Sequence, residues 1–181
     1  APAAPAVQEE SYTSEIHGRV TSRFRGRWAG GENDQDLYQY VALDVGNPLS
    51  DPVTLHVMIR AAEDIDGNVG RQGHYPFDSI DDTYTDNVNF RFYYGYVDVH
   101  EAGPFDSVRA GRQMMDETPI SLYFDGVRAE TPEYSELASL KVGAYGGSPV
   151  HLYESSPSGD ALFGGFLQAR PWQGARARLD Y

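Results

Sequence analysis

The stretch Ser11–Trp28, SYTSEIHGRVTSRFRGRW, decides the fold class of this chain. Its even positions carry no charge and include Ile, Val, Phe and Trp, whereas its odd positions are all polar. The polar positions include Arg19, Arg23, Arg25 and Arg27. A helix would scatter these arginines around its circumference, but a β-strand places alternate residues on opposite faces. The stretch therefore predicts a strand with one apolar face and one polar face.

The same alternation recurs along the chain and predicts an all-β, antiparallel protein. Strands are expected at residues 11–28, 37–46, 53–61, 88–96, 107–113, 120–130, 136–145, 161–170 and 172–181. The segment Ala29–Asp36 (AGGENDQD) is expected to be a turn or loop. Because the connections alternate between short and long, we predict an up-and-down meander that forms a transmembrane β-barrel or part of one.

Composition excludes several classes of protein. The chain has 181 residues, with 27 acidic against 14 basic ones, so it is a poor partner for the phosphates of a nucleic acid. It has no cysteine, which excludes disulfides, thiolate metal sites and covalently attached c-type haem on this chain. No apolar run approaches the roughly 20 residues of a transmembrane helix, but a barrel strand needs only about 9–11.

The first ten residues differ from the rest of the chain. They begin APAAPA and have neither the basic nor the apolar region of a signal peptide. We therefore expect residues 1–10 to be a flexible mature N-terminus left after signal-peptide removal, and 11–181 to form one β-barrel domain of about nine strands. A disordered terminus of another kind of protein fits the same ten residues equally well.

Three features favour a membrane barrel over a soluble β-sandwich. The apolar face of the first strand mixes Gly, Ser, Tyr and Trp with aliphatic residues, whereas a sandwich core prefers interlocking aliphatic residues. The polar face is dense in arginine, which suits a water-filled lumen. Aromatic residues fall near predicted strand ends, where a barrel has its interfacial girdles. These residues are Trp28, Tyr38, Tyr40, Tyr94, Tyr96, Trp172 and Tyr181.

Alternation also assigns residues to the two faces. In the strand near residue 90, one aromatic face is expected, made of Val88, Phe90, Phe92, Tyr94 and Tyr96. The predicted lumen-lining residues are Arg19, Arg23, Arg25, Arg27, Asp44, Arg60 and Arg91. The arginine row would either attract anions into an open lumen or form a cross-strand ladder with acids such as Asp44 or Asp98. The excess of acidic residues favours the ladder.

Five segments carry a resemblance to a known family. The segments HGRVTSRFRGRW, DLYQYVALDVG, FRFYYGYVDV, VRAGRQ and LYFDGVRAE resemble the N-terminal portion of the porin-like outer-membrane barrels of Gram-negative bacteria. The resemblance implies a place in the cell outer membrane, contact with its lipid, and a role as a diffusion pore or a sheath for a partner protein. Some similar barrels sheath multihaem cytochromes, so such a cytochrome is an expected partner.

The expected strand number adds a second partner. Single-chain bacterial barrels normally have an even number of strands, and nine are expected here. Members of the resembling family also tend to be longer than this chain. We therefore expect a second chain, or a continuation of this one, to complete the barrel.

Motifs for chemistry are few. Asp64, Asp66 and Asn68 resemble the opening of a calcium loop, but Tyr75 stands where such a loop has its bidentate Glu. Solvated loop acids are the favoured alternative, and calcium is the one cofactor considered. Because GxSxG, P-loop and dinucleotide-binding motifs are lacking, the chain is predicted not to be an enzyme. The alternative function is a secreted soluble β-sandwich that binds glycan or protein, and a third is a hydrolase using loop carboxylates.

Overall fold

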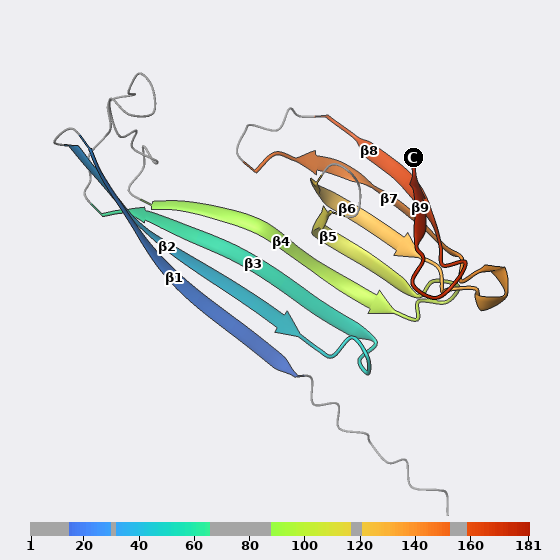
Figure 1. Ribbon diagram of the computed structural model, residues 1–181. Helices are drawn as coiled ribbons and strands as arrows, with labels where there is room; N and C mark the ends of the chain where they lie inside the picture. Colours follow the sequence, from blue (N-terminus) through green and yellow to red (C-terminus); the bar gives the residue numbers. More distant parts are fainter. Residues whose placement is uncertain (1–14, 30–31, 66–87, 117–120, 153–158) are drawn as a thin grey trace, which may run out of the picture.

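The computed structural model describes residues 15–29, 32–65, 88–116, 121–152 and 159–181, which form a single antiparallel sheet of nine strands (Figure 1). The strands are β1 (Ile16–Ala29), β2 (Glu32–Val45), β3 (Val53–Asp64), β4 (Val88–His100), β5 (Ser107–Met115), β6 (Leu122–Glu130), β7 (Lys141–Val150), β8 (Leu162–Ala169) and β9 (Ala177–Asp180). A short 3-10 helix, η1 (Ser135–Leu137), precedes β7. No helix in these ranges is long and apolar enough to cross a membrane.

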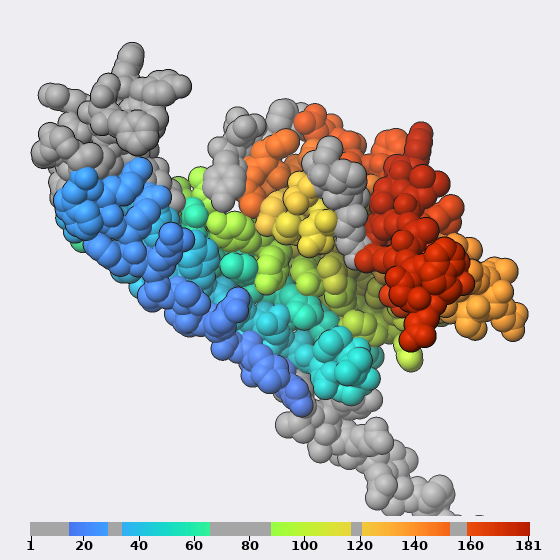
Figure 2. Space-filling view, in the orientation of Figure 1, coloured from blue at the N-terminus to red at the C-terminus, as the bar shows by residue number. Residues whose placement is uncertain are grey.

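The spatial order of the strands is their order in the chain, and every neighbouring pair is antiparallel. The prediction of an all-β, up-and-down meander is confirmed. The sheet curls but does not close, because β1 and β9 are its two edges (Figure 1). Figure 2 shows the blue surface of β1 and the dark red surface of β9 on separate sides of the molecule. The predicted flexible segment 1–10 lies outside the described residues.

The two faces of the sheet differ in composition and burial. Val20, Val41, Ile59 and Phe92 are in register across four strands, and their exposed fractions are 68%, 37%, 38% and 41%. On the opposite face Asp98 is only 5% exposed. Side chains crowd together on the concave side of a curved sheet and spread apart on the convex side. The apolar side is therefore the convex outer face, and the polar side is the concave inner face.

The outer face is apolar from one edge of the sheet to the other. Its exposed apolar residues are Ile16, Val20, Phe24, Trp28, Val41, Val53, Ile59, Val88, Phe90, Phe92, Val97, Val99, Val127, Val142, Phe163, Leu167 and Leu179. In register with these residues are three that carry charge, namely Glu63 at the end of β3 and the pair Arg112 and Asp125. Arg112 and Asp125 form an ion pair with an Nε–Oδ1 distance of 2.7 Å. Arg112 also donates to the carbonyl oxygen of Phe92 at 3.1 Å and lies over its ring. Its charge is thus compensated at the point where the β4–β5 ladder ends.

A β-bulge in β4 reverses the alternation of faces. Met58 of β3 lies opposite Tyr94 and Ile59 lies opposite Phe92, so Tyr93 is the extra residue. A bulge shifts every later side chain of its strand to the other face. Tyr94 and Tyr96 therefore lie on the inner face, and the prediction of one continuous aromatic face is wrong beyond Phe92.

Three predicted boundaries also need correction. The loop expected at Ala29–Asp36 is wrong, because β2 begins at Glu32 and stays paired with β1 along its length. The strand expected at 136–145 runs instead over Lys141–Val150, because the chain first makes the turn of η1 and two left-handed residues, Ala138 and Ser139. The final strand is shorter than expected.

Gly111 marks a place where the strands approach closely. Its φ is +124°, and a Cβ there would lie 2.3 Å from the carbonyl oxygen of Gly95. We expect Gly111→Ala to lower the free energy of unfolding by about 2 kcal/mol, because the new residue is both strained and obstructed. Gly18→Ala is the matched control, since nothing lies within 4 Å of its Cβ position. Urea unfolding in detergent compares the two, and equal losses would contradict the argument.

Candidate functional site: the polar inner face

The seven predicted lumen-lining residues all lie on the inner face. Arg25 and Arg27 are opposite Asp36 and Asp34, and Arg60 is opposite Arg91. The remaining three positions follow from the same register, and the full set is Arg19, Arg23, Arg25, Arg27, Asp44, Arg60 and Arg91. The structure thus brings these residues to one concave surface.

The first ion-pair cluster joins β1 to β2. Arg25 donates from Nε to Asp36 at 3.0 Å, and the Tyr38 hydroxyl donates to the same carboxylate at 2.9 Å. Arg27 donates from Nε to Asp34 at 2.7 Å. Asp34 and Asp36 are buried, so their charges depend on these arginines. The partners of Arg25 and Arg27 are therefore Asp36 and Asp34, not the Asp44 or Asp98 considered from the sequence.

The second cluster lies on β4 and β5. Arg109 makes two hydrogen bonds of 2.8 Å to Asp98, one from Nε and one from Nη2. Its guanidinium carbon also lies 3.9 Å from the centre of the Tyr96 ring, which is a cation–π distance. Asp44 is paired elsewhere, with His56, at 2.6 Å between Oδ1 and Nδ1. Both acids suggested as partners for β1 thus serve other strands.

The third cluster joins β6 to β9. The ring of Phe166 is buried between two guanidinium groups, Arg128 at 5.4 Å and Arg178 at 4.0 Å from its centre. Next to it, Lys141 pairs with Glu130 at 3.3 Å. This part of the inner face is again a network of compensated charges around an aromatic ring.

Arg60 and Arg91 are like charges placed opposite each other, an arrangement that is unfavourable by itself. Arg60 lies over two tyrosine rings, 5.6 Å from the centre of Tyr38 and 5.8 Å from that of Tyr93. The π faces of these rings attract the buried guanidinium and offset part of the repulsion.

A hollow of about 420 Å³ lies where β4 and β5 separate, and most of its lining residues belong to the inner face. The β4–β5 ladder covers only Gly95–His100 of β4, so the strands diverge beyond it. The lining residues are Tyr40, Met58, Tyr93, Tyr94, Tyr96, Arg109, Met114 and Tyr123. Such a surface can stack planar groups and offers several hydroxyls for hydrogen bonds.

Four of the predicted girdle residues line the inner face instead of the outer surface. Tyr38 and Tyr40 lie there because their alternation in β2 matches that of Asp34 and Asp36, and Tyr94 and Tyr96 lie there because of the bulge. The list of misplaced residues is Tyr38, Tyr40, Tyr94 and Tyr96. By contrast Trp28, Trp172 and Tyr181 are exposed, with fractions of 67%, 71% and 95%.

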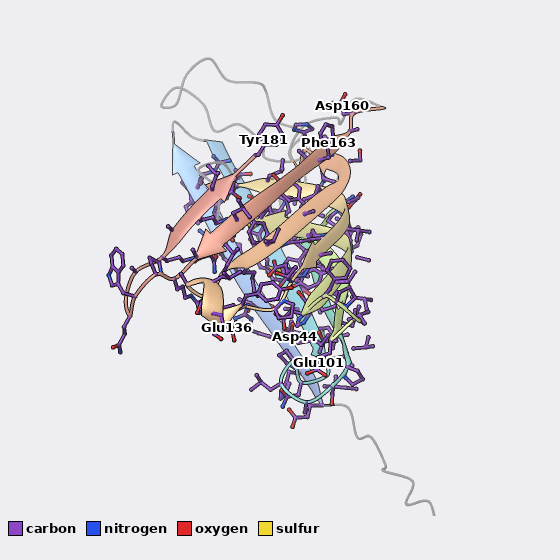
Figure 3. The ribbon with its side chains drawn as sticks, turned by 90° about the vertical axis from the view of Figure 1, so that its right-hand side faces the viewer. Asp44, Glu101, Glu136, Asp160, Phe163 and Tyr181 are labelled. Atoms are coloured by element: carbon purple, nitrogen blue, oxygen red, sulfur yellow. The ribbon has the colours of Figure 1, made fainter. Side chains whose placement is uncertain are left out.

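Exposed aromatic residues lie at both ends of the strands, with Phe105, Tyr134 and Trp172 in connections at one end and a second group at the other. Trp28 closes β1, Phe90 begins β4 and Phe163 begins β8, which in a meander all fall at the same end. Figure 3 shows Phe163, Tyr181 and Asp160 at the end where Trp28 and Phe90 lie, and Asp44, Glu101 and Glu136 at the other.

The predicted calcium site is only partly visible. Asp64 ends β3, whereas Asp66 and Asn68 lie outside the described residues. Within the described ranges, no group of three or more His, Asp or Glu residues could hold a metal ion. Calcium binding therefore stays a prediction.

Among the charged inner residues that the sequence analysis missed are Asp34, Asp36 and Arg109, and also the four of the third cluster, Arg128, Glu130, Lys141 and Arg178. The signal for the first two was present, because Asp34, Asp36 and Tyr38 continue a period of two into β2.

Comparison of the chain with protein-family models, with curated proteins and with solved structures gave no match.

Proposed function

We propose that this chain forms part of the wall of a β-barrel in a bacterial outer membrane, as a diffusion pore or as a sheath for a partner protein. The observation that carries the proposal is the contrast between the faces. The outer face is apolar and exposed across the sheet, and the inner face holds buried, paired charges. A membrane barrel needs this arrangement, since lipid meets the outside and water meets the inside.

An aqueous environment would not suit the outer face. Monomeric proteins in water rarely expose contiguous apolar patches larger than a few hundred Å². A β-sandwich would cover such a face with a second sheet, but the described residues form one sheet. The contrast therefore favours the barrel over the sandwich that the sequence left open.

The exposed aromatic residues at the strand ends add support. Trp and Tyr concentrate where a membrane meets water, and Trp28 and Tyr181 hold that position in the proposed barrel. The resemblance of five segments to porin-like outer-membrane barrels points the same way.

The paired charges of the inner face limit the functions that the proposed lumen can have. Arg25, Arg27, Arg109 and Arg128 are compensated by carboxylates, so these arginines do not form a continuous positive lining. The mixed, paired surface supports passage of small polar solutes or close contact with a guest protein, of which a multihaem cytochrome is one proposed example. The tyrosine hollow would provide a stacking surface for either.

Fractionation of the native protein tests the proposal. We expect it to stay with the membranes through alkaline and urea washes and to require detergent for extraction, since its outer face would otherwise be in water. A periplasmic protein released by the same washes is the control. A monodisperse protein in buffer without detergent would overturn the proposal, and the tyrosine hollow would then be tested for glycan binding.

A further inference from the structure

Two arginines differ from all other basic residues in the described part of the chain. The sequence has 14 Lys and Arg residues, and all except Arg71 lie in the described ranges. Arg19 and Arg23 alone among them lack an ion pair, hydrogen bond or ring contact there. Both are exposed and belong to β1.

Their position explains why no partner is present. Arg25 and Arg27 of the same row lie opposite Asp36 and Asp34 of β2. Arg19 lies opposite Ala42, and Arg23 lies opposite Tyr38, so β2 has no carboxylate directly opposite either arginine. The diagonal carboxylates, Asp44 and Asp36, are held by His56 and Arg25. The other neighbour of these arginines would be a strand on the open side of β1.

The open side of β1 is built to receive a strand. β1 has 14 residues and, within the described part of the chain, pairs only with β2, so alternate backbone N–H and C=O groups point away from the sheet. The opposite edge, β9, has only four residues and cannot cover that length. Its Arg178 is moreover already paired with Asp180, at 2.8 Å.

We propose that β1 pairs with an antiparallel strand of a partner that carries two carboxylates four residues apart, opposite Arg19 and Arg23. The spacing follows from the register of the arginines, and both carboxylates fall on the inner face because side chains alternate. The residues on the outer face of that strand are apolar, so that they continue the apolar outer face of β1, where Val20 and Phe24 lie. This inference rests on the proposed function, since it names the strand that continues the barrel wall.

Charge argues against a second copy of the same chain as the occupant. Two β1 strands pairing with each other would place one arginine row beside another, and like charges on adjacent strands are unfavourable. An acidic partner strand turns the same positions into ion pairs, as Asp34 and Asp36 do elsewhere in the row.

Two synthetic peptides of about ten residues test the proposal in detergent and in buffer. Both alternate valine and threonine, and they carry either two glutamates or two lysines four residues apart on the threonine face. Measured by fluorescence anisotropy, the glutamate peptide is expected to bind about tenfold more tightly, because two pairs change from repulsive to attractive. Equal affinities would overturn the proposal.

Two double variants locate the effect. R19E/R23E should reverse the preference to the lysine peptide, whereas R170E/R176E, the matched control with the same change in net charge, should keep it. An unchanged preference in R19E/R23E would overturn the assignment to β1. Both arginines of β1 are exposed and unpaired, so their replacement leaves the described contacts intact.

Cysteine crosslinking identifies the occupant directly, because the chain has no cysteine. Thr21→Cys lies between the two arginines and should form a disulfide with a glutamate peptide that carries cysteine midway between its acids. Disulfide-linked pairs of the protein would assign the edge to a second copy, and an internal disulfide in Thr21→Cys/Arg178→Cys would assign it to β9. Either result overturns the proposal.

This test and the fractionation can fail separately. If the protein needs detergent but binds both peptides equally, the barrel proposal stands and the acidic-partner proposal is overturned. If the protein is stable in buffer and still prefers the glutamate peptide, the proposed pairing at the β1 edge stands and the membrane-barrel proposal is overturned.

Discussion

Val41→Arg is expected to lower the free energy of unfolding in lipid vesicles by about 2–4 kcal/mol, the cost of a cation near the middle of a lipid-facing strand. Val41 lies in the outer row, between Val20 and Ile59, and is 37% exposed. On a face in contact with water the same change would alter stability by only about 0.5 kcal/mol. Urea titration of vesicle-folded protein, followed by tryptophan fluorescence, measures the difference.

Ala42→Arg is the matched control, since Ala42 is the next residue of β2 and lies on the inner face. It lies opposite Arg19 and Met58, so a modest like-charge penalty of under about 1 kcal/mol is expected. Similar losses for Val41→Arg and Ala42→Arg would mean that the outer face does not meet lipid.

Asp98→Ala is expected to cost about 3 kcal/mol, because it leaves Arg109 without its carboxylate in a buried site. The side chains of Asp98 and Arg109 are 7% and 28% exposed, and two hydrogen bonds join them. Asp106→Ala is the control, because the Asp106 side chain is half exposed and its partner Lys141 keeps Glu130. That change should cost less than about 1 kcal/mol.

Replacing both partners separates the ion pair from its surroundings. Asp98→Leu/Arg109→Leu should be much closer to the stability of the wild-type protein than Asp98→Ala, since no unpaired charge remains. If the double variant lost as much as Asp98→Ala, the effect would come from packing around Tyr96 and not from charge.

Much of the fold could be predicted because strands have a period that the sequence displays directly. The alternation in β1 and β3 identified their faces correctly, and the arginine row was placed on the inner face. The order of the strands followed because a meander pairs consecutive segments. These features depend on local pattern alone.

What could not be predicted depends on single residues or on distant strands. The bulge at Tyr93 adds one residue without any change of composition, yet it moves Tyr94 and Tyr96 to the other face. Asp34 and Asp36 stood in a polar stretch after two glycines, which looked like a loop until their pairing with β1 was seen. The Phe166 site combines residues from three strands, and no spacing in the sequence connects them.

The meander has a consequence for how the chain folds. All eight described pairings join consecutive strands, so most hairpins close a short stretch of chain at little entropic cost, the exception being β3–β4, whose connection is residues 65–87. Folding can therefore advance hairpin by hairpin, while the open side of β1 stays available as a template for any extended polypeptide.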